Sequence, residues 1–112
     1  MRQRQPRRHD KAHLEFVRQL PCMACGDDIG SEAAHIRFPD RRAAKPKCGL
    51  GEKPDDAWVV PLCRRCHHQQ HGMSERAFWN NAGIDPIFIA LALRNMSGDI
   101  DAGCLIVKLA KI

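Results

Sequence analysis

The first apolar stripe of the chain follows a charged, polar arm. Four residues recur at the i, i+3, i+4 and i+7 positions of one helical face: His13, Phe16, Val17 and Leu20. Asp10 can cap this helix, and Pro21 ends it because a residue before proline is pushed out of the helical region. We expect His13 to be packed or hydrogen-bonded on the buried face. Residues 1–9 have no apolar periodicity and are expected to form a disordered basic arm.

Two short segments in the middle of the chain have the pattern of strands. In residues 32–37, Ala33 and His35 share one face and Ala34 and Ile36 the other. Residues 58–62 are apolar and β-branched, and Pro61 limits this strand to an edge or to its last residues. Residues 38–56 lie between them and are rich in Pro, Gly and Lys. Irregular segments of this length are usually functional in a small domain.

Helix start and stop residues punctuate the second half of the chain. The segment 61–72 begins as a Cys-x-x-Cys turn and continues as a helix that Gly72 can end. Ser74 and Gly83 bracket another helix, and Asp85-Pro86 opens a further one that is apolar nearly all round and therefore buried or at an interface. Residues 100–112 fit either an edge strand or a packed extension. We therefore expect an α+β domain over residues 10–96, with flanking helices and an extension at 97–112.

The composition favours metal binding over disulfides. The chain has 112 residues, enough for one small domain in which a structural metal would matter. It has six cysteines, yet no apolar signal region at its N-terminus and no apolar run of membrane-spanning length. We expect a protein of a reducing, cytoplasmic compartment, where paired Cys-x-x-Cys motifs bind zinc. Cys22 and Cys25 would supply one pair of thiolates and Cys63 and Cys66 the other, leaving Cys48 and Cys104 as ordinary thiols.

Two histidines directly after the second cysteine pair suggest a further metal site. His67 and His71 are four residues apart, so both imidazoles would project from one face of a helix. They could hold a second, harder divalent ion. Two other roles stay open: a hydrogen bond from His67 toward the zinc ligands, and a favourable place for His71 at the C-terminal end of the helix dipole.

The positive charge is unevenly distributed. The net charge is +5, and arginines crowd the N-terminal arm. A second group of basic residues lies in the central segment: Arg37, Arg41, Arg42, Lys45, Lys47 and Lys53. Such clusters attract phosphate without reading base sequence, so a nucleic acid is one possible partner. A solvated tail and loop is the other interpretation.

Three motifs taken together resemble those of the HNH, or ββα-metal, endonucleases. They are Ala34-His-Ile-Arg37, then Gly49-x-Gly-x-Lys-Pro-x-Asp56, then Val-Pro-Leu-Cys-x-x-Cys-His67-x-x-x-His71. The chain is most similar to the phage and prophage subgroup related to the Ref nuclease, over roughly residues 12 to 95. The resemblance implies a zinc-stapled ββα-metal fold and a DNA endonuclease of phage or prophage DNA processing or recombination, with a recombinase filament as a partner.

The resemblance also implies roles for individual residues. His35 would be the general base, and His67 and His71 would bind a catalytic Mg²⁺ or Mn²⁺ in addition to the structural Zn²⁺. Two positions depart from the family pattern. Ala34 stands where many members have a metal-binding Asp or His, so His35 itself could be a ligand instead. Asp56 is nearest to the place of the family's Asn, where it could orient His35 or bind the metal. A non-catalytic zinc module that binds nucleic acid is the alternative function.

Overall fold

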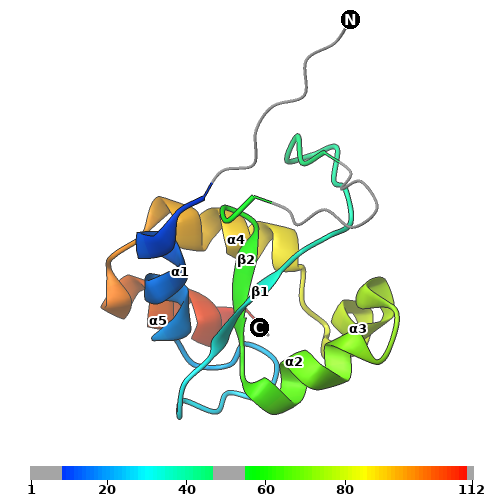
Figure 1. Ribbon diagram of the computed structural model, residues 1–112, viewed down its shortest axis with the longest axis horizontal. Coiled ribbons are helices and arrows are strands. Elements are labelled where there is room, and N and C mark those ends of the chain that lie inside the picture. Colours follow the sequence, from blue (N-terminus) through cyan, green and yellow to red (C-terminus); the bar gives the residue numbers. More distant parts are fainter. Residues whose placement is uncertain (1–8, 47–54, 111–112) are drawn as a thin grey trace, which may run out of the picture.

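The computed structural model describes residues 9–46 and 55–110, which form two strands and five helices (Figure 1). In chain order these are α1 (Lys11–Arg18), β1 (Glu32–His35), β2 (Val59–Leu62), α2 (Arg64–His71), α3 (Glu75–Ala82), α4 (Pro86–Asn95) and α5 (Ile100–Leu109). The expected α+β class is therefore confirmed. Lys47, Cys48 and Lys53 of the predicted functional segment lie outside the described residues, as does the arm up to residue 8.

The two strands pair antiparallel in the middle of the molecule. Glu32 stands opposite Leu62 and His35 opposite Val59, and beyond the last pair the Ile36 N–H donates to the Trp58 carbonyl at 2.9 Å. All of β2 is buried. Pro61 fits this strand because a two-stranded sheet leaves one edge of each strand outside the ladder, where a missing N–H costs nothing. The two predicted strands are thus present, each slightly shorter than expected.

Helix α1 packs against both strands and carries the predicted apolar stripe. His13, Phe16 and Val17 are buried, and the Asp10 carboxylate caps the helix by accepting from the His13 N–H at 3.0 Å. The imidazole of His13 is held by the Ser97 hydroxyl, 2.8 Å from Nδ1. Burial lowers the pKa of His13 below its ordinary value. His13 is therefore a structural histidine, as predicted.

Two helices of the C-terminal half complete the core. Helix α4 packs against β2 and α5 packs against α4 (Figure 1). Ser74 and Asp85 cap α3 and α4 as predicted, and Gly83 ends α3 in the left-handed region at φ +71°. None of the helices within residues 9–46 and 55–110 has the length and apolarity needed to cross a membrane.

The structure decides the conformation of the C-terminal extension in favour of a packed helix. Residues 100–109 form α5, with Val107 and Gly103 buried. A Cβ atom added to Gly103 would lie 2.8 Å from both Leu20 Cδ2 and Phe16 Cζ. Glycine at this position therefore allows α5 to approach α1 closely.

Candidate functional site

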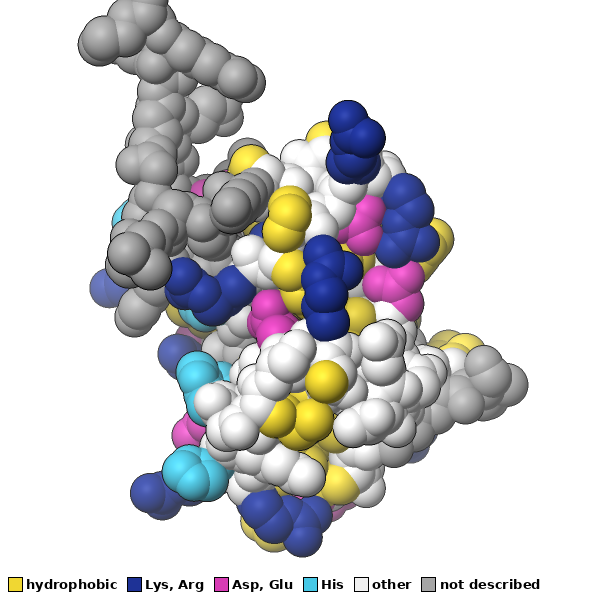
Figure 2. Space-filling model, turned by 90° about the vertical axis from the view of Figure 1, so that its right-hand side faces the viewer, with side chains coloured by type: hydrophobic (Ala, Val, Ile, Leu, Met, Phe, Trp, Pro, Cys, Tyr) yellow, Lys and Arg dark blue, Asp and Glu magenta, His cyan; other side chains and the backbone are white. Residues whose placement is uncertain are grey.

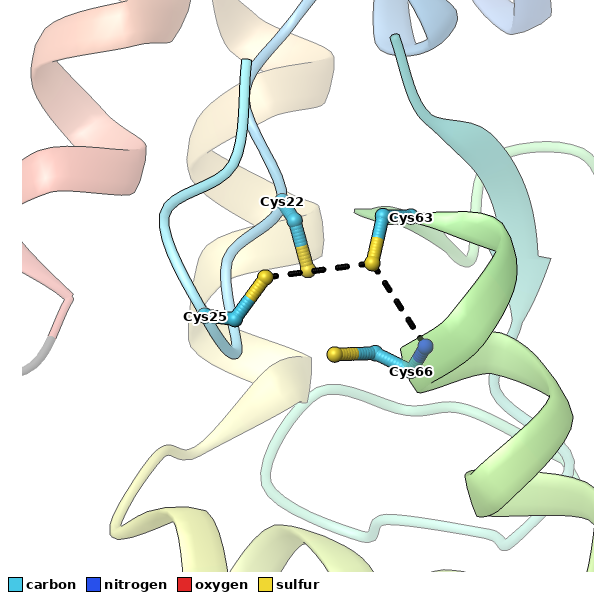
Figure 3. A group of neighbouring side chains, drawn as sticks. All are labelled: Cys22, Cys25, Cys63 and Cys66. Atoms are coloured by element: carbon cyan, nitrogen blue, oxygen red, sulfur yellow. Dashed lines mark hydrogen bonds between the residues drawn. The ribbon is translucent and has the colours of Figure 1, made fainter. Parts of the chain in front are cut away.

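Four cysteine side chains converge where the turn after α1 meets the start of α2 (Figure 3). The sulfur atoms of Cys22, Cys25, Cys63 and Cys66 all lie within 4.8 Å of one another. Cys63 is the N-cap of α2, and its sulfur accepts from the Cys66 N–H at 3.5 Å. On the other side, Gly26 closes the Cys22 turn at φ +83° and donates its N–H to the Cys22 carbonyl at 2.8 Å.

The spacing of these sulfurs fits a tetrahedral zinc ion. Four thiolates at about 2.3 Å from a central zinc stand about 3.8 Å apart, and the Cys25 and Cys63 sulfurs are 3.8 Å apart. A hydrogen bond from the Asp27 backbone N–H is the main cause that lowers the pKa of Cys25 to about 7. This ligand therefore reaches the thiolate form near neutral pH. Burial raises the pKa of the Cys66 thiol because it disfavours the charged thiolate, and a bound cation would stabilise that thiolate. The four cysteines could hold a zinc ion, as the sequence predicted.

Such an ion would join segments that are distant in sequence. The Met23 N–H donates to the Pro61 carbonyl at 3.0 Å, so the first cysteine turn is already bonded to β2. A metal held by the four sulfurs would fix this turn to the first turn of α2. A zinc ion bound here would therefore stabilise the position of α2 beside the two strands.

His35 and Asp56 form a hydrogen-bonded pair at the opposite end of the hairpin. Nε2 of His35 is 2.9 Å from Oδ1 of Asp56. The other carboxylate oxygen of Asp56 accepts from the Asp10 N–H at 2.8 Å, beside the start of α1. Asp56 is 2% exposed, whereas the His35 side chain is 22% exposed. Two roles were considered for Asp56, orienting His35 or binding the metal, and in the structure its carboxylate contacts His35.

His67 and His71 form a second pair, on α2. Their Nε2 atoms are 3.1 Å apart, and Nδ1 of His67 is 2.7 Å from a carboxylate oxygen of Glu32. Both histidines line an open depression of about 680 Å³ whose other lining residues are Glu32, Arg64, Arg65 and His68. His35 and Asp56 are not among the described residues that line it. The predicted site thus appears as two separate pairs carried by one strand–strand–helix unit.

Position 34 shows how the chain departs from the HNH pattern. Ala34 is 3% exposed and packs in the core opposite Val60. Within the described residues, groups of three or more His, Cys, Asp or Glu side chains with converging ligand atoms comprise only the four cysteines. The imidazole pair on α2 therefore has no third protein ligand among these residue types in the described part of the chain.

The basic residues predicted to contact DNA differ in their availability. Arg37 and Arg41 are exposed. The guanidinium of Arg42 is bonded to the carboxylates of Asp40 at 2.8 Å and Asp85 at 3.1 Å. Lys45 is only 4% exposed, with its Nζ 5.8 Å from the centre of the Trp58 ring. An ammonium buried in this way is less available to a phosphate than the exposed guanidinium groups of Arg37 and Arg41, and contact of Lys45 with DNA stays a prediction.

The backbone that follows His35 is held by α3. The carboxylate of Glu75 accepts from the N–H groups of Arg37, at 3.1 and 3.2 Å, and of Phe38, at 3.2 Å. The Arg76 guanidinium lies 4.6 Å from the centre of the Phe38 ring. Burial raises the pKa of Glu75 even though these hydrogen bonds favour its charged form. The contacts fix the end of β1 from which the exposed Arg37 side chain projects.

Four residues of the depression were not among the predicted site residues: His68, which directly follows His67, and also Arg64, Arg65 and Glu32. Arg64 and Arg65 stand between the second pair of cysteines, and Glu32 precedes His35 by three positions. The signal for the arginines is their place in the metal-rich stretch. Glu32 gives no such signal, because its contact with His67 depends on how α2 packs beside β1. Figure 2 shows histidine side chains close to Lys and Arg side chains along one edge of the face drawn there.

A comparison with protein families assigns the chain to one of them. A family described as a protein of unknown function (DUF968) matches residues 1–98. The chain belongs to the DUF968 family. No curated protein and no solved structure matches this DUF968 chain significantly. The matched region contains the His35–Asp56 pair, the His67–His71 pair and all four clustered cysteines.

Proposed function

We propose that this DUF968 protein is a DNA endonuclease of the HNH, or ββα-metal, type with a structural zinc ion. The observation that carries the proposal is the His35–Asp56 pair. A partly exposed imidazole held by a buried carboxylate is the arrangement that a general base needs, and a zinc module that only binds nucleic acid does not require it. The resemblance to the phage and prophage nucleases supports the same assignment and suggests a role in DNA processing or recombination.

In this proposal His35 takes a proton from the attacking water. An ionised Asp56 can only accept hydrogen bonds, so Nε2 of His35 carries the hydrogen that it donates at 2.9 Å. The lone pair of the neutral ring is then on Nδ1. Asp56 also stabilises the imidazolium that forms when Nδ1 binds a proton. The Asp10 N–H keeps the carboxylate in place during this transfer.

His67 and His71 are the residues that would hold the catalytic divalent ion. Their Nε2 atoms are 3.1 Å apart, and imidazole nitrogens are ligands for divalent transition metals such as Zn²⁺, Fe²⁺ and Ni²⁺. When bound, the ion would supply positive charge for the phosphate oxygens and the leaving group. Two imidazoles without a carboxylate ligand suit Mg²⁺ poorly, because Mg²⁺ prefers oxygen ligands. Of the two catalytic ions expected from the sequence, Mn²⁺ is a transition metal and accepts nitrogen ligands more readily than Mg²⁺, so Mn²⁺ is the ion used in the test below.

DNA would be bound through its phosphates and with little sequence preference. Arg37 is exposed and lies two residues after His35, and Arg64 lines the same depression as His67 and His71. Each of the two proposed catalytic pairs therefore has an arginine close to it in the chain or on the surface. Contacts of this kind position the backbone but carry no base information. Arg42 contributes less because two carboxylates already hold it.

Nicking of supercoiled plasmid DNA by zinc-loaded protein tests the proposal. The wild type should nick in the presence of Mn²⁺, and His35→Ala should lower the rate about 10²–10⁴-fold while DNA affinity stays the same. Gln69→Ala is the matched control, since Gln69 is exposed on α2 and outside the lining of the depression. Equal nicking by wild type and His35→Ala, or DNA binding without any nicking, would instead support the non-catalytic module.

A further inference from the structure

The carboxylate of Glu32 is bonded to the nitrogen of His67 that faces away from His71. Nδ1 of His67 is 2.7 Å from Oε1 of Glu32, and Nε2 is 3.1 Å from Nε2 of His71. The three side chains therefore form a line in which the His67 ring joins a carboxylate to a second imidazole. All three line the same open depression.

The order of these atoms fixes the tautomer of His67. A carboxylate only accepts, so Nδ1 of His67 carries the hydrogen and donates it to Glu32. The lone pair of the neutral ring is then on Nε2, on the side of His71. In the structure Nε2 of His71 can donate its hydrogen to this lone pair. The same lone pair is what a divalent ion between the two rings requires.

The strand register explains why Glu32 is available for this contact. Glu32 is the first residue of β1 and stands opposite Leu62, which is directly followed by Cys63 at the N-cap of α2. The His67 N–H donates to the Cys63 carbonyl at 2.9 Å, so His67 lies one turn above this junction. Glu32 therefore reaches His67 from the hairpin rather than from its own helix.

We infer that Glu32 is a positioning residue, which holds the His67 ring so that Nε2 is directed at the metal site. This inference rests on the proposed role of His67 and His71 as metal ligands. Glu32 does not supply the metal ligand that is missing at position 34. Its carboxylate is bonded to Nδ1 of His67, on the side of the ring away from Nε2 and the proposed metal site. The hydrogen bond from His67 to Glu32 instead fixes the orientation and the tautomer of the His67 ring, so that less order has to be imposed when His67 and His71 bind the metal.

The size of the expected effect follows from what a hydrogen-bonded partner does for a ligating histidine. Removing such a partner typically weakens metal binding by about 10- to 100-fold, since the ring must then be ordered and set in the right tautomer by the metal itself. The Glu32 side chain is 51% exposed and makes no contribution to the core, so its removal should leave the fold intact.

Isothermal titration of zinc-loaded protein with Ni²⁺ tests the inference. Ni²⁺ is the probe because imidazole sites bind it more tightly than Mn²⁺, and metal analysis after the titration checks that the cysteine zinc is retained. We expect Glu32→Ala to weaken Ni²⁺ binding about 10- to 100-fold. Glu32→Gln should lose less, because its amide oxygen still accepts from Nδ1. Glu15→Ala, which removes an exposed carboxylate from α1, should have no effect.

The outcomes separate this inference from the proposed function. If His67→Ala abolishes Ni²⁺ binding but Glu32→Ala matches the wild type, the positioning role is wrong and the metal site stands. Equal losses in Glu32→Ala and Glu32→Gln would also overturn it, because only the negative charge would then matter. If neither His67→Ala nor His71→Ala changes Ni²⁺ binding, the metal site itself is wrong. Thermal melts of all variants should coincide with that of the wild type.

Discussion

Replacement of Asp56 by asparagine changes the charge of the His35 partner with almost no change of shape. Within the described part of the chain, Asp56 accepts hydrogen bonds from His35 and from the Asp10 N–H. An asparagine has one oxygen that can accept and an NH₂ group that can only donate. Asp56→Asn must therefore lose one of the two bonds, or it must donate from its NH₂ to a ring nitrogen of His35. The second case requires the His35 ring to rotate, or its hydrogen to move from Nε2 to Nδ1.

The structure sets the magnitude of both effects. A hydrogen bond to a charged group contributes roughly 1.5–3 kcal/mol, so losing one should lower the free energy of unfolding by about that amount. For a domain of this size the melting temperature should fall by about 6–12 °C, at roughly 4 °C per kcal/mol. The NH₂ of the asparagine favours the tautomer of His35 with its hydrogen on Nδ1, which removes the lone pair needed there. We expect the nicking rate to fall about 10²–10⁴-fold.

The two effects are measured separately on the same zinc-loaded samples. Urea denaturation gives the free energy of unfolding, and supercoiled plasmid nicking with Mn²⁺ gives the rate at a temperature where both proteins are folded. Asp55→Asn is a matched control, because it makes the same chemical change at the neighbouring position, whose side chain is less buried.

One result would refute the reasoning about the pair. If Asp56→Asn has lower stability but nicks DNA at the wild-type rate, Asp56 is a structural carboxylate that ties α1 to the hairpin, and His35 does not depend on it. A loss of nicking with wild-type stability would instead show that the bond from the Asp10 N–H contributes little to the fold.

Three further predictions concern zinc, pH and charge. Cys22→Ser, or removal of zinc by a chelator, should abolish the cooperative thermal transition, because structural zinc contributes roughly 10 kcal/mol or more to such sites; metal analysis giving less than one zinc per chain would contradict this. Burial lowers the pKa of His13 below 6.5, so the unfolded chain binds its proton more readily, and the free energy of unfolding should fall as pH drops below that value. His13→Gln should flatten that fall in urea titrations between about pH 7.5 and pH 5. Arg37→Ala should reduce the slope of log affinity for DNA against log salt by about one, whereas Arg42→Ala should change it less; equal slopes would show that the carboxylates on Arg42 do not matter.

Much of the fold could be predicted because its signals are local. Asp10, Ser74 and Asp85 cap their helices in the structure, since a short polar side chain before an apolar stripe satisfies the free N–H groups of the first turn. The cysteine cluster was equally accessible, because the Cys-x-x-Cys spacing brings two sulfurs together within one turn. Residues 100–109 could not be decided, because a short apolar run fits a strand or a helix until its partner is known.

The candidate site could be predicted only in part. His35, Asp56, His67 and His71 were chosen from motif spacing, and the structure places them in two pairs. The burial of Lys45 was not predictable, because basic residues in an irregular segment are normally exposed and only the packing of Trp58 shows otherwise.

The sequence by itself therefore determined most of the elements and the four cysteines of the candidate zinc site, because caps, apolar periods and cysteine spacing act over a few residues. Only the tertiary structure decided which side chains meet across elements. Asp56 contacts both His35 and the start of α1, and Glu32 contacts His67. The lack of a side chain at Gly103 leaves room for Leu20 and Phe16 of the N-terminal part of the chain. These contacts depend on strand register and on the angles between packed helices, which no short stretch of sequence encodes.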